Sequence, residues 1–317
     1  MTTRLTIYCN RKPVTGPWGG GNRILQSFIN EARAAGHDVI FSLSDAFRDD
    51  ARVDVIFCMD PRQGATSDEL SHDAIMAIFP NASQRPFIVQ RVGDIGTHGK
   101  PELRNLVIRT APVSDFVIFP SEWCSTMVND SLFKLGKMMN DYAVIWNSPN
   151  PAFFAHRRVS RPIPQKNIRF VTHHWSMNPK KGFAFYNELD AWCKNNGHTF
   201  TFYGRAPDTA TFTSSGVLDV DELARSLPMH DVYVTASEEE AGANHVLEAM
   251  ACGLPILYHM NGGSIPEYVR NCGESFNESF ETALSTLANR VNAGNFPVYN
   301  IRKSAGQSLV ELIEKYV

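Results

Sequence analysis

Two glutamates close to a glycine are the residues whose types and spacing most readily suggest chemistry. Glu240 and Glu248 stand eight positions apart, and Gly242 comes just before a stretch of helical period that we expect to begin near Asn244. A loop carboxylate at Glu240, together with the unpaired N–H groups of a helix N-terminus, can hold a sugar hydroxyl and a phosphate. Glu248 lies one turn inside the helix, where a carboxylate that accepts two hydrogen bonds suits a ribose diol.

The same residues also have a purely structural explanation. Two glutamates at this spacing arise often by chance, and Glu238–Glu240 alone is typical of a solvated run of charge. A second candidate is the segment Thr15–Asn22, TGPWGGGN, which follows an expected strand and precedes an expected helix. Its glycines would let the backbone approach an anion, or they form a flexible turn. Neither a G-x-G-x-x-G fingerprint nor a P-loop motif is present.

The elements that must position these residues alternate regularly along the chain. Short β-branched or aromatic runs predict strands, and longer stretches with one apolar face predict helices. The expected strands are 5–8, 39–43, 53–58, 87–90, 116–119, 143–146, 168–172, 199–203, 232–235 and 255–258. The expected helices are 22–35, one capped by Ser121, 182–195, 221–227, 244–252 and 301–316.

Strands that alternate with helices of this length predict an α/β protein with parallel sheets covered on both faces. The alternation breaks at 147–167, which contains four prolines, so we place a domain boundary there. The expected domains are 1–150 and 151–317, with the final helix either staying in the second domain or packing back on the first. Two such doubly wound domains would face each other across a cleft, where ligands bind beyond the carboxyl ends of the strands.

The residues around the two glutamates resemble the retaining glycosyltransferases of family 4, which have the GT-B fold of two Rossmann-like domains. The hallmark of that family is a Glu, seven residues, a second Glu and an Ala-Met-Ala-x-Gly-x-Pro run. Here Glu240 and Glu248 are followed by Ala249–Pro255, AMACGLP, and then by the glycines and glutamate of Gly262–Glu267. Lys181–Gly182 matches the family's Lys-Gly after the first strand of the second domain, and Ile145–Asn147 resembles its Ile-x-Asn. The resemblance is specific over about 168–270 and diffuse over 1–150.

The resemblance implies transfer of a sugar from a UDP- or GDP-linked donor to a hydroxyl of a glycan or another acceptor, with retention of configuration. In that family the first Glu faces the donor sugar, the second Glu binds the ribose and the Lys stabilises the leaving diphosphate. These roles fall on Glu240, Glu248 and Lys181. The expected nucleotide-sugar contacts are Gly19, Gly20, Gly21, Arg205, Gly242, Ala243, Asn244, His245 and Glu248, and the expected acceptor contacts are Arg91, Asp94 and His98.

Three positions depart from the family pattern. The usual Gly-Arg before the Lys reads Trp175–Ser176, so one diphosphate-binding cation is missing, and Lys180, Arg205 and a histidine are the candidates to replace it. The usual Gly-Phe-Gly after the first Glu reads Ala241–Ala243, and the family's N-terminal His is not evident. A non-catalytic module that binds a nucleotide sugar or a glycan on a degenerate GT-B fold therefore stays open as an alternative, as does a nucleotide-sugar epimerase.

Composition narrows the remaining classes. The 317 residues carry 30 Lys and Arg against 33 Asp and Glu, a net charge of −3, so a broad nucleic-acid-binding surface is not expected. No apolar run reaches the length of a membrane span, although peripheral membrane contact and the oligomeric state stay open. Six cysteines without a C-x-x-C pattern indicate reduced thiols in a cytoplasmic protein. No metal and no cofactor are expected, because the histidines lack a metal-binding spacing and an Asp N-cap explains the D-x-D at 219–221.

Overall fold

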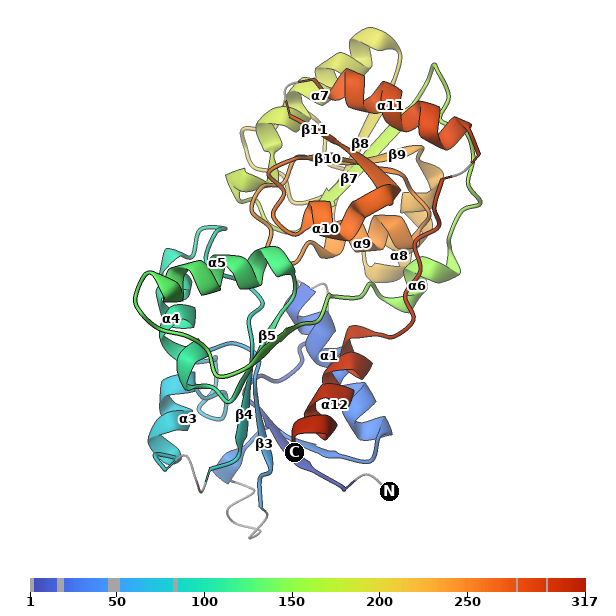
Figure 1. The fold of residues 1–317 in the computed structure, drawn as a ribbon. Coiled ribbons are helices and arrows are strands. Elements are labelled where there is room, and N and C mark those ends of the chain that lie inside the picture. Colours follow the sequence, from blue (N-terminus) through green and yellow to red (C-terminus); the bar gives the residue numbers. More distant parts are fainter. Residues whose placement is uncertain (1–2, 16–19, 45–51, 82–84, 278, 295) are drawn as a thin grey trace. The chain divides into compact units, whose positions relative to one another are not determined.

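The computed structural model describes residues 3–15, 20–44, 52–81, 85–277, 279–294 and 296–317. The chain divides into two compact units, each built on its own parallel sheet (Figure 1). The first unit is formed by Met1–Thr15, Gly20–Asn147 and Lys303–Val317, and the second contains Ser148–Arg302. The chain therefore leaves the first unit after Asn147 and returns to it at Lys303.

Within its described residues, the first unit has six strands in the order β2-β1-β3-β4-β5-β6, and each neighbouring pair is parallel. Every residue of β3 and β5 is buried, as expected of strands in a parallel sheet covered on both faces. The strands are β1 (Thr6–Cys9), β2 (Asp38–Ile40), β3 (Val55–Cys58), β4 (Phe87–Arg91), β5 (Phe116–Phe119) and β6 (Tyr142–Val144). The helices are α1 (Gly20–Ala34), α3 (His72–Ile78), α4 (Pro101–Thr110), α5 (Glu122–Phe133) and α12 (Ala305–Tyr316), with the short turn η1 (Ala111–Val113).

The final helix belongs to the core of the first unit. Leu309 and Ile313 of α12 are buried in the same apolar cluster as Ile24 and Phe28 of α1. A Cβ on Gly306 would lie 2.5 Å from the Ser27 backbone, so a glycine is needed for the two helices to pack this closely. Of the two placements that the sequence left open for this helix, the structure has the one against the N-terminal sheet.

Over residues 148–302, apart from 278 and 295, the second unit has five parallel strands in the order β11-β10-β9-β7-β8. The strands are β7 (Arg169–His174), β8 (Thr199–Gly204), β9 (Val232–Thr235), β10 (Ile256–His259) and β11 (Gly273–Phe276). The helices are α6 (Pro151–Ala155), α7 (Phe183–Asn196), α8 (Val220–Ser226), α9 (Asn244–Ala251), α10 (Ile265–Val269) and α11 (Phe280–Asn292). Short 3-10 turns lie at η2 (Pro179–Lys181), η3 (Leu227–Met229) and η4 (Arg270–Cys272).

The α/β class and the strands and helices expected from the sequence are confirmed, with ends shifted by a few residues. One shift concerns the glycine segment, because α1 begins at Gly20 and not at Asn22, so Gly20 and Gly21 lie in its first turn. The D-x-D prediction is also confirmed, since Asp219 caps α8 and accepts the Glu222 N–H at 2.8 Å. Elements that the sequence reading missed are β11, α3, α4, α6, α10 and α11.

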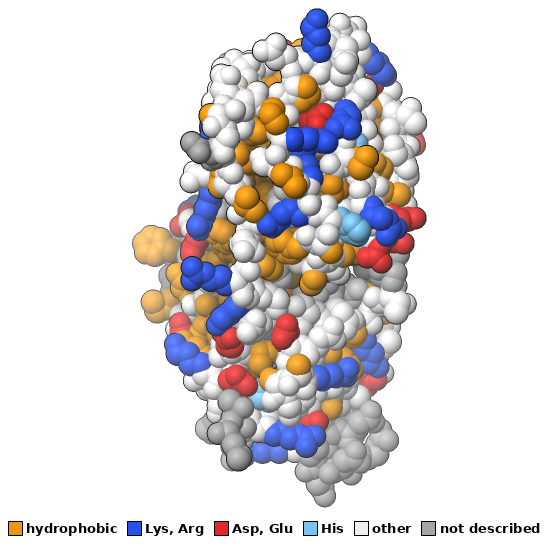
Figure 2. All heavy atoms as spheres, turned by 90° about the vertical axis from the view of Figure 1, so that its right-hand side faces the viewer, with side chains coloured by type: hydrophobic (Ala, Val, Ile, Leu, Met, Phe, Trp, Pro, Cys, Tyr) orange, Lys and Arg blue, Asp and Glu red, His pale blue; other side chains and the backbone are white. Residues whose placement is uncertain are grey.

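Surface charge is mixed, as the composition predicts. On the face drawn in Figure 2, basic and acidic side chains are interspersed with hydrophobic ones.

Candidate active site

The carboxyl edge of the second sheet gathers the charged residues that the sequence singled out. β7 lies between β9 and β8 and is parallel to both, so the carboxyl ends of the three strands meet at one edge. Lys181 follows β7, Arg205 follows β8 and Glu240 follows β9. This is the edge at which open α/β sheets bind ligands.

Lys181 is brought to Glu240 by a capped turn and a glycine. The Asn178 side chain caps η2 by accepting the Lys180 N–H at 2.9 Å. Gly182 has φ +86°, and a Cβ there would lie 2.4 Å from Ala236, so a glycine lets the loops after β7 and β9 touch. The Lys181 Nζ lies 2.5 Å from the Glu240 Oε1, and the side chains are only 13% and 10% exposed. The sequence motif thus corresponds to a largely buried ion pair.

The backbone around Glu240 is joined to the loop after β10. The Glu240 N–H donates to the Gly262 carbonyl at 3.3 Å, and the Glu240 carbonyl accepts the Ser264 N–H at 2.8 Å. Gly263 has φ +67°, and a Cβ there would lie 2.5 Å from the Glu240 carbonyl oxygen, which explains the glycine at this position. Glu239 has φ +52°, an unfavourable left-handed conformation for a non-glycine residue. Strain of this kind is typical of functional loops.

The first turn of α9 follows this loop directly. Its N-cap residue is Ala243, and no side chain in the described part of the chain forms a cap hydrogen bond there. The N-terminus of a helix carries a partial positive charge. Gly242, Ala243 and Asn244 lie at this helix start, as expected for contacts to an anion. The fourth expected contact of this segment, His245, differs from these three residues in its environment. Its side chain is buried, and its Nε2 lies 3.1 Å from Thr235 Oγ1. The His245 side chain therefore braces the start of α9 against the end of β9.

Glu248 is held by a histidine that the sequence reading did not assign to the site. The Glu248 carboxyl is buried, and its Oε2 lies 2.8 Å from His173 Nε2. His173 Nδ1 lies 3.1 Å from the Tyr233 hydroxyl, and burial raises the pKa of that hydroxyl. This chain of contacts fits an imidazole that accepts from Tyr233 at Nδ1 and donates to Glu248 from Nε2. The pair His173–His174 at the end of β7 was the available signal.

The neighbouring residue His174 extends this buried polar network. Its Nε2 lies 2.8 Å from the Tyr186 hydroxyl, which also accepts the Ala236 N–H at 3.0 Å. Burial raises the pKa of Tyr186 to about 12, so the hydroxyl keeps its proton. The ends of β7 and β9 are thus tied together beneath the charged residues.

Arg205 lies against the residue that replaces the family's glycine. Its guanidinium is 4.0 Å from the centre of the Trp175 ring, a cation–π contact. The two side chains meet because β7 and β8 end in register, with the Arg205 N–H donating to the His174 carbonyl at 3.1 Å. A Cβ on Gly204 would lie 1.9 Å from the His174 carbonyl oxygen, so a glycine is required at the end of β8.

The N-terminal candidates have separate surroundings. Gly19 lies outside the described residues, and Gly20 and Gly21 open α1. Arg91, at the end of β4, is 3% exposed and donates to Asn147 Oδ1 at 2.5 Å. That bond joins the expected acceptor residue Arg91 to the segment Ile145–Asn147, which the sequence singled out separately.

The other two acceptor candidates lie in the loop after β4. Asp94 accepts the Gly96 N–H at 2.8 Å and lies 3.4 Å from the Lys100 Nζ, and His98 is half-buried. All three acceptor candidates thus lie at or just after the end of one strand, β4, and a local turn already uses the Asp94 carboxylate.

Comparisons with known proteins give a family match within the second unit. Residues 166–289 match the family described as glycosyl transferases group 1. The match lies within the second unit and supports the predicted enzyme class. The matched range contains Lys181, Arg205, Glu240 and Glu248. No curated protein sequence matches the chain significantly.

Solved structures support the fold over nearly the whole chain. Sucrose-phosphate synthase from Thermosynechococcus elongatus has a TM-score of 0.61 at 15% identity, covering 98% of this chain and 94% of that one. The lipopolysaccharide outer core galactosyltransferase WaaB has a TM-score of 0.61 at 12% identity, covering 99% and 100%. The pneumococcal O-GlcNAc transferase GtfA, solved with UDP and GlcNAc, has a TM-score of 0.51 at 12% identity, covering 83% and 53%. The predicted GT-B fold is confirmed.

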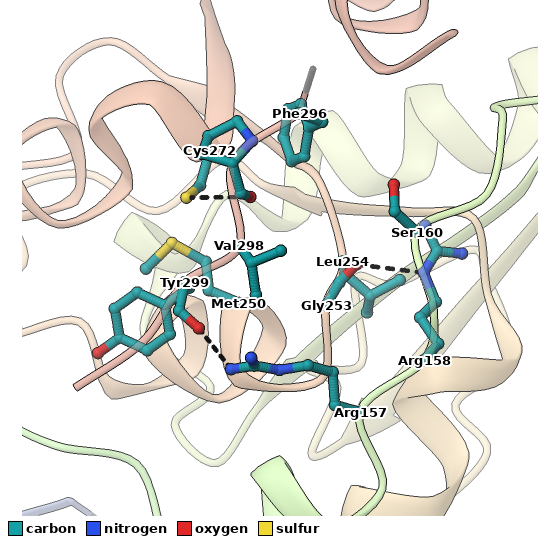
Figure 3. Close-up of a pocket in the computed structure, with 11 residues that line it drawn as sticks. Arg157, Arg158, Ser160, Met250, Gly253, Leu254, Cys272, Phe296, Val298 and Tyr299 are labelled. Carbon is teal, nitrogen blue, oxygen red and sulfur yellow. Dashed lines mark hydrogen bonds between the residues drawn. The ribbon is translucent and has the colours of Figure 1, made fainter. Parts of the chain in front are cut away.

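A cavity in the second unit lies at the C-terminal end of α9, away from the residues described above, and has a structural role (Figure 3). It lies between the segment after α6, the C-terminal end of α9 and residues 296–299, and its volume is about 40 Å³. Arg157 donates to the Tyr299 carbonyl, and Arg158 donates to the Gly253 carbonyl at 3.2 Å. Ligand pockets are usually about 300 Å³ or larger, so this space is too small for a nucleotide sugar. Arg157 thus fastens the segment through which the chain returns to the first unit, and Arg158 fastens the loop after α9.

Proposed function

We propose that this chain is a retaining glycosyltransferase that moves a sugar from a UDP- or GDP-linked donor to a hydroxyl of a glycan or another acceptor, without a metal ion. The observation that carries the proposal is the pairing of Lys181 with Glu240 at the carboxyl edge of the second sheet, beside the start of α9. The presence of UDP in the GtfA structure supports a uridine donor as the first to test.

Lys181 is proposed to change partners during the reaction. In this structure its ammonium is neutralised by Glu240. A bound diphosphate would take over the ammonium, and the Glu240 carboxylate would then be available to the donor sugar. The bond between the sugar C1 and the phosphate oxygen breaks with its electron pair going to the diphosphate. Lys181 and the α9 N-terminus meet that charge as pre-arranged electrostatic stabilisation.

The acceptor oxygen forms the new bond on the face that the diphosphate leaves. Its proton passes to the departing phosphate oxygen, so atoms and charges balance without an enzyme nucleophile. Retention of configuration follows from attack on that same face. Within this scheme no side chain has to form a covalent intermediate with the sugar.

Glu248 is proposed to hold the ribose of the nucleotide. Its carboxylate is fixed by His173, and a buried carboxylate with one oxygen occupied by a donor can still accept further hydrogen bonds. The ring orientation of His173 depends on Tyr233, so both residues position Glu248 and need not touch the ligand.

Arg205 is proposed to supply the diphosphate cation that Ser176 lacks. Stacking on Trp175 orients a guanidinium while leaving its N–H edge available to oxygen atoms, and arginine suits phosphate in this geometry.

Arg205→Lys keeps the charge and weakens the stacking, whereas Trp175→Leu removes the ring. Both variants are expected to raise the dissociation constant for the diphosphate by a similar factor. If Trp175→Leu leaves it unchanged, the stacked orientation has no role.

The direct test is release of nucleoside diphosphate from a panel of UDP- and GDP-sugars, with and without a mixture of glycan acceptors. We expect one donor to be turned over faster with acceptor, at an equal rate after addition of a chelator, and with retained configuration in the NMR spectrum of the product. Binding of a donor without any product would favour the alternative of a non-catalytic module. Interconversion of the donor sugar without an acceptor would favour an epimerase.

A further inference from the structure

The turn that follows α5 exposes large apolar side chains. Phe133 is 84% exposed, Leu135 60% and Met138 80%. The inner face of α5 is buried as usual, and Leu132 next to the turn is 1% exposed. Three apolar side chains within six residues therefore face outward without contributing to the core of this unit.

The turn is an ordered structure and not an extended loop. The Gly136 N–H donates to the Phe133 carbonyl, and the Lys137 N–H donates to the Leu132 carbonyl, both at 3.0 Å. Gly136 has φ +66°, the left-handed conformation that commonly ends a helix. Met139 is 8% exposed and anchors the far end. These bonds hold the outward side chains in place.

Basic residues surround the apolar ones. Lys134 and Lys137 are exposed within the turn, and Arg104 of α4 donates to Ser131 at 2.9 Å, two residues before Phe133. The nearest acidic residues along the chain are Asp130 and Asp141, and Asp141 accepts the Tyr316 hydroxyl at 3.0 Å. The six residues Phe133–Met138, which we call the basic turn, thus carry two positive charges and no negative one.

We propose that the basic turn binds the surface of an anionic lipid bilayer. Protruding apolar side chains beside lysines suit the boundary between headgroups and acyl chains. The apolar side chains are buried there, and the lysines are attracted to the anionic headgroups. Among the residues that the structure describes, no helix is long and apolar enough to cross a membrane, so the contact would be peripheral.

A lipid surface fits the basic turn better than a protein partner does. Stable protein interfaces bury about 800 Å² on each side and involve about 20 residues or more. The basic turn offers six residues on a convex turn, which can enter a bilayer surface but cannot form such an interface alone. The proposal is independent of the proposed sugar transfer.

The test is co-sedimentation of the full chain with phosphatidylcholine vesicles, with and without one third phosphatidylglycerol. We expect binding to the anionic vesicles only. Replacing Lys134 and Lys137 by Gln should weaken the partition about 30-fold, because each lysine near such a surface contributes roughly a factor of five to six. Phe133→Ser with Met138→Ser should weaken it at least tenfold.

Met229→Ser is the matched control, since Met229 is 62% exposed but lies in the second unit. Its binding should equal that of the unchanged chain, and all variants should keep the same unfolding midpoint. Equal binding to both kinds of vesicle, or full binding by the Phe133 and Met138 variant, would overturn the proposal. So would a dimer in size-exclusion chromatography that Phe133→Ser dissociates, which would make the basic turn a contact between two copies.

Discussion

The two units differ in how their candidate functional residues are arranged. In the second unit, Lys181 and Glu240 come from different strands and meet in a largely buried ion pair, and His173 reaches Glu248 across 75 positions of sequence. In the first unit, Arg91 ends β4, Asp94 and His98 come just after it, and Asp94 is bound mainly within its own turn. Convergence of charged groups from several strands indicates a ligand site more strongly than a cluster along one segment, because local turn geometry can account for the latter.

The largest expected effect concerns Lys181. Replacement of Lys181 by Ala should lower the turnover number by about 10²–10³, the usual loss when one charge-stabilising group is removed from a transition state. The measurement is the steady-state rate with the donor found in the panel.

Lys180→Ala is the control, since Lys180 directly precedes Lys181 and pairs with Glu239 near the surface. Its rate should stay within about threefold of the unchanged chain, as exposed ion pairs contribute little. Equal losses in the two variants would show that the Lys181 contact is structural, and the contrast between the units would lose its main support.

The second-largest expected effect concerns His72, and it tests whether the buried polar groups of the first unit stabilise the fold. His72 lies 3.0 Å from Ser114, which in turn donates to Gln90, and burial lowers the pKa of His72 from 6.5 to about 4. Between these pH values His72 is protonated in the unfolded chain but not in the folded chain. The free energy of unfolding should therefore fall as the pH drops from 6.5 to 4. The expected loss is roughly 3 kcal/mol, measured by denaturant unfolding.

His72→Gln removes the titrating group and should flatten that pH dependence. His156 is exposed in the second unit, so His156→Gln should leave the dependence as it is. An unchanged slope in His72→Gln would mean that other groups cause the acid sensitivity.

Glu248 should give an intermediate effect on binding. Glu248→Gln removes the charge and keeps the shape, and should raise the dissociation constant for the nucleotide roughly 10- to 100-fold, the value of a hydrogen bond to a charged group. Isothermal titration measures this directly. Glu274→Gln changes a carboxylate on β11 of the same unit, one that pairs with Arg290, and this variant should bind the nucleotide as the unchanged chain does. If turnover falls in Glu248→Gln while affinity holds, Glu248 acts on the sugar and not on the ribose.

The smallest effect concerns the D-x-D segment. Asp219→Ala removes the cap of α8 and should cost about 1 kcal/mol, lowering the unfolding midpoint by about 2–4 °C without changing activity. Asp221 stands in the same segment but is not the cap, so Asp221→Ala should have almost no effect. A loss of activity in both variants would instead indicate a metal–diphosphate site.

Much of the fold was predictable from local pattern. The strands of both sheets are short apolar runs, and helix starts such as Asp219 and Ser121 show their capping residues in the sequence. α11 was missed although Leu284, Leu287 and Val291 form a readable stripe. α6 and α10 have five residues each and are too short to show a helical period, so their helical state depends on packing.

The site was predictable only in part. The identities of Lys181, Glu240 and Glu248 came from a motif, but the partners of these residues depend on the register of distant strands. Trp175 and Arg205 meet because β7 and β8 end in register, and nothing in their local sequence predicts that contact. The same holds for His173, whose partner lies on a helix that follows another strand.

The measurement that tests the central claim most directly is thermal unfolding of the full chain with UDP, GDP, ADP, CDP or dTDP in excess. At about 100 times its dissociation constant, a bound nucleotide stabilises by about 2.7 kcal/mol, which corresponds to a shift of roughly 5–10 °C for a unit of this size. We predict this shift for one nucleotide, most readily UDP or GDP, and its loss in Glu248→Gln. No shift with any of the five, or a shift that Glu248→Gln retains in full, would contradict a nucleotide site at the carboxyl edge of the second sheet.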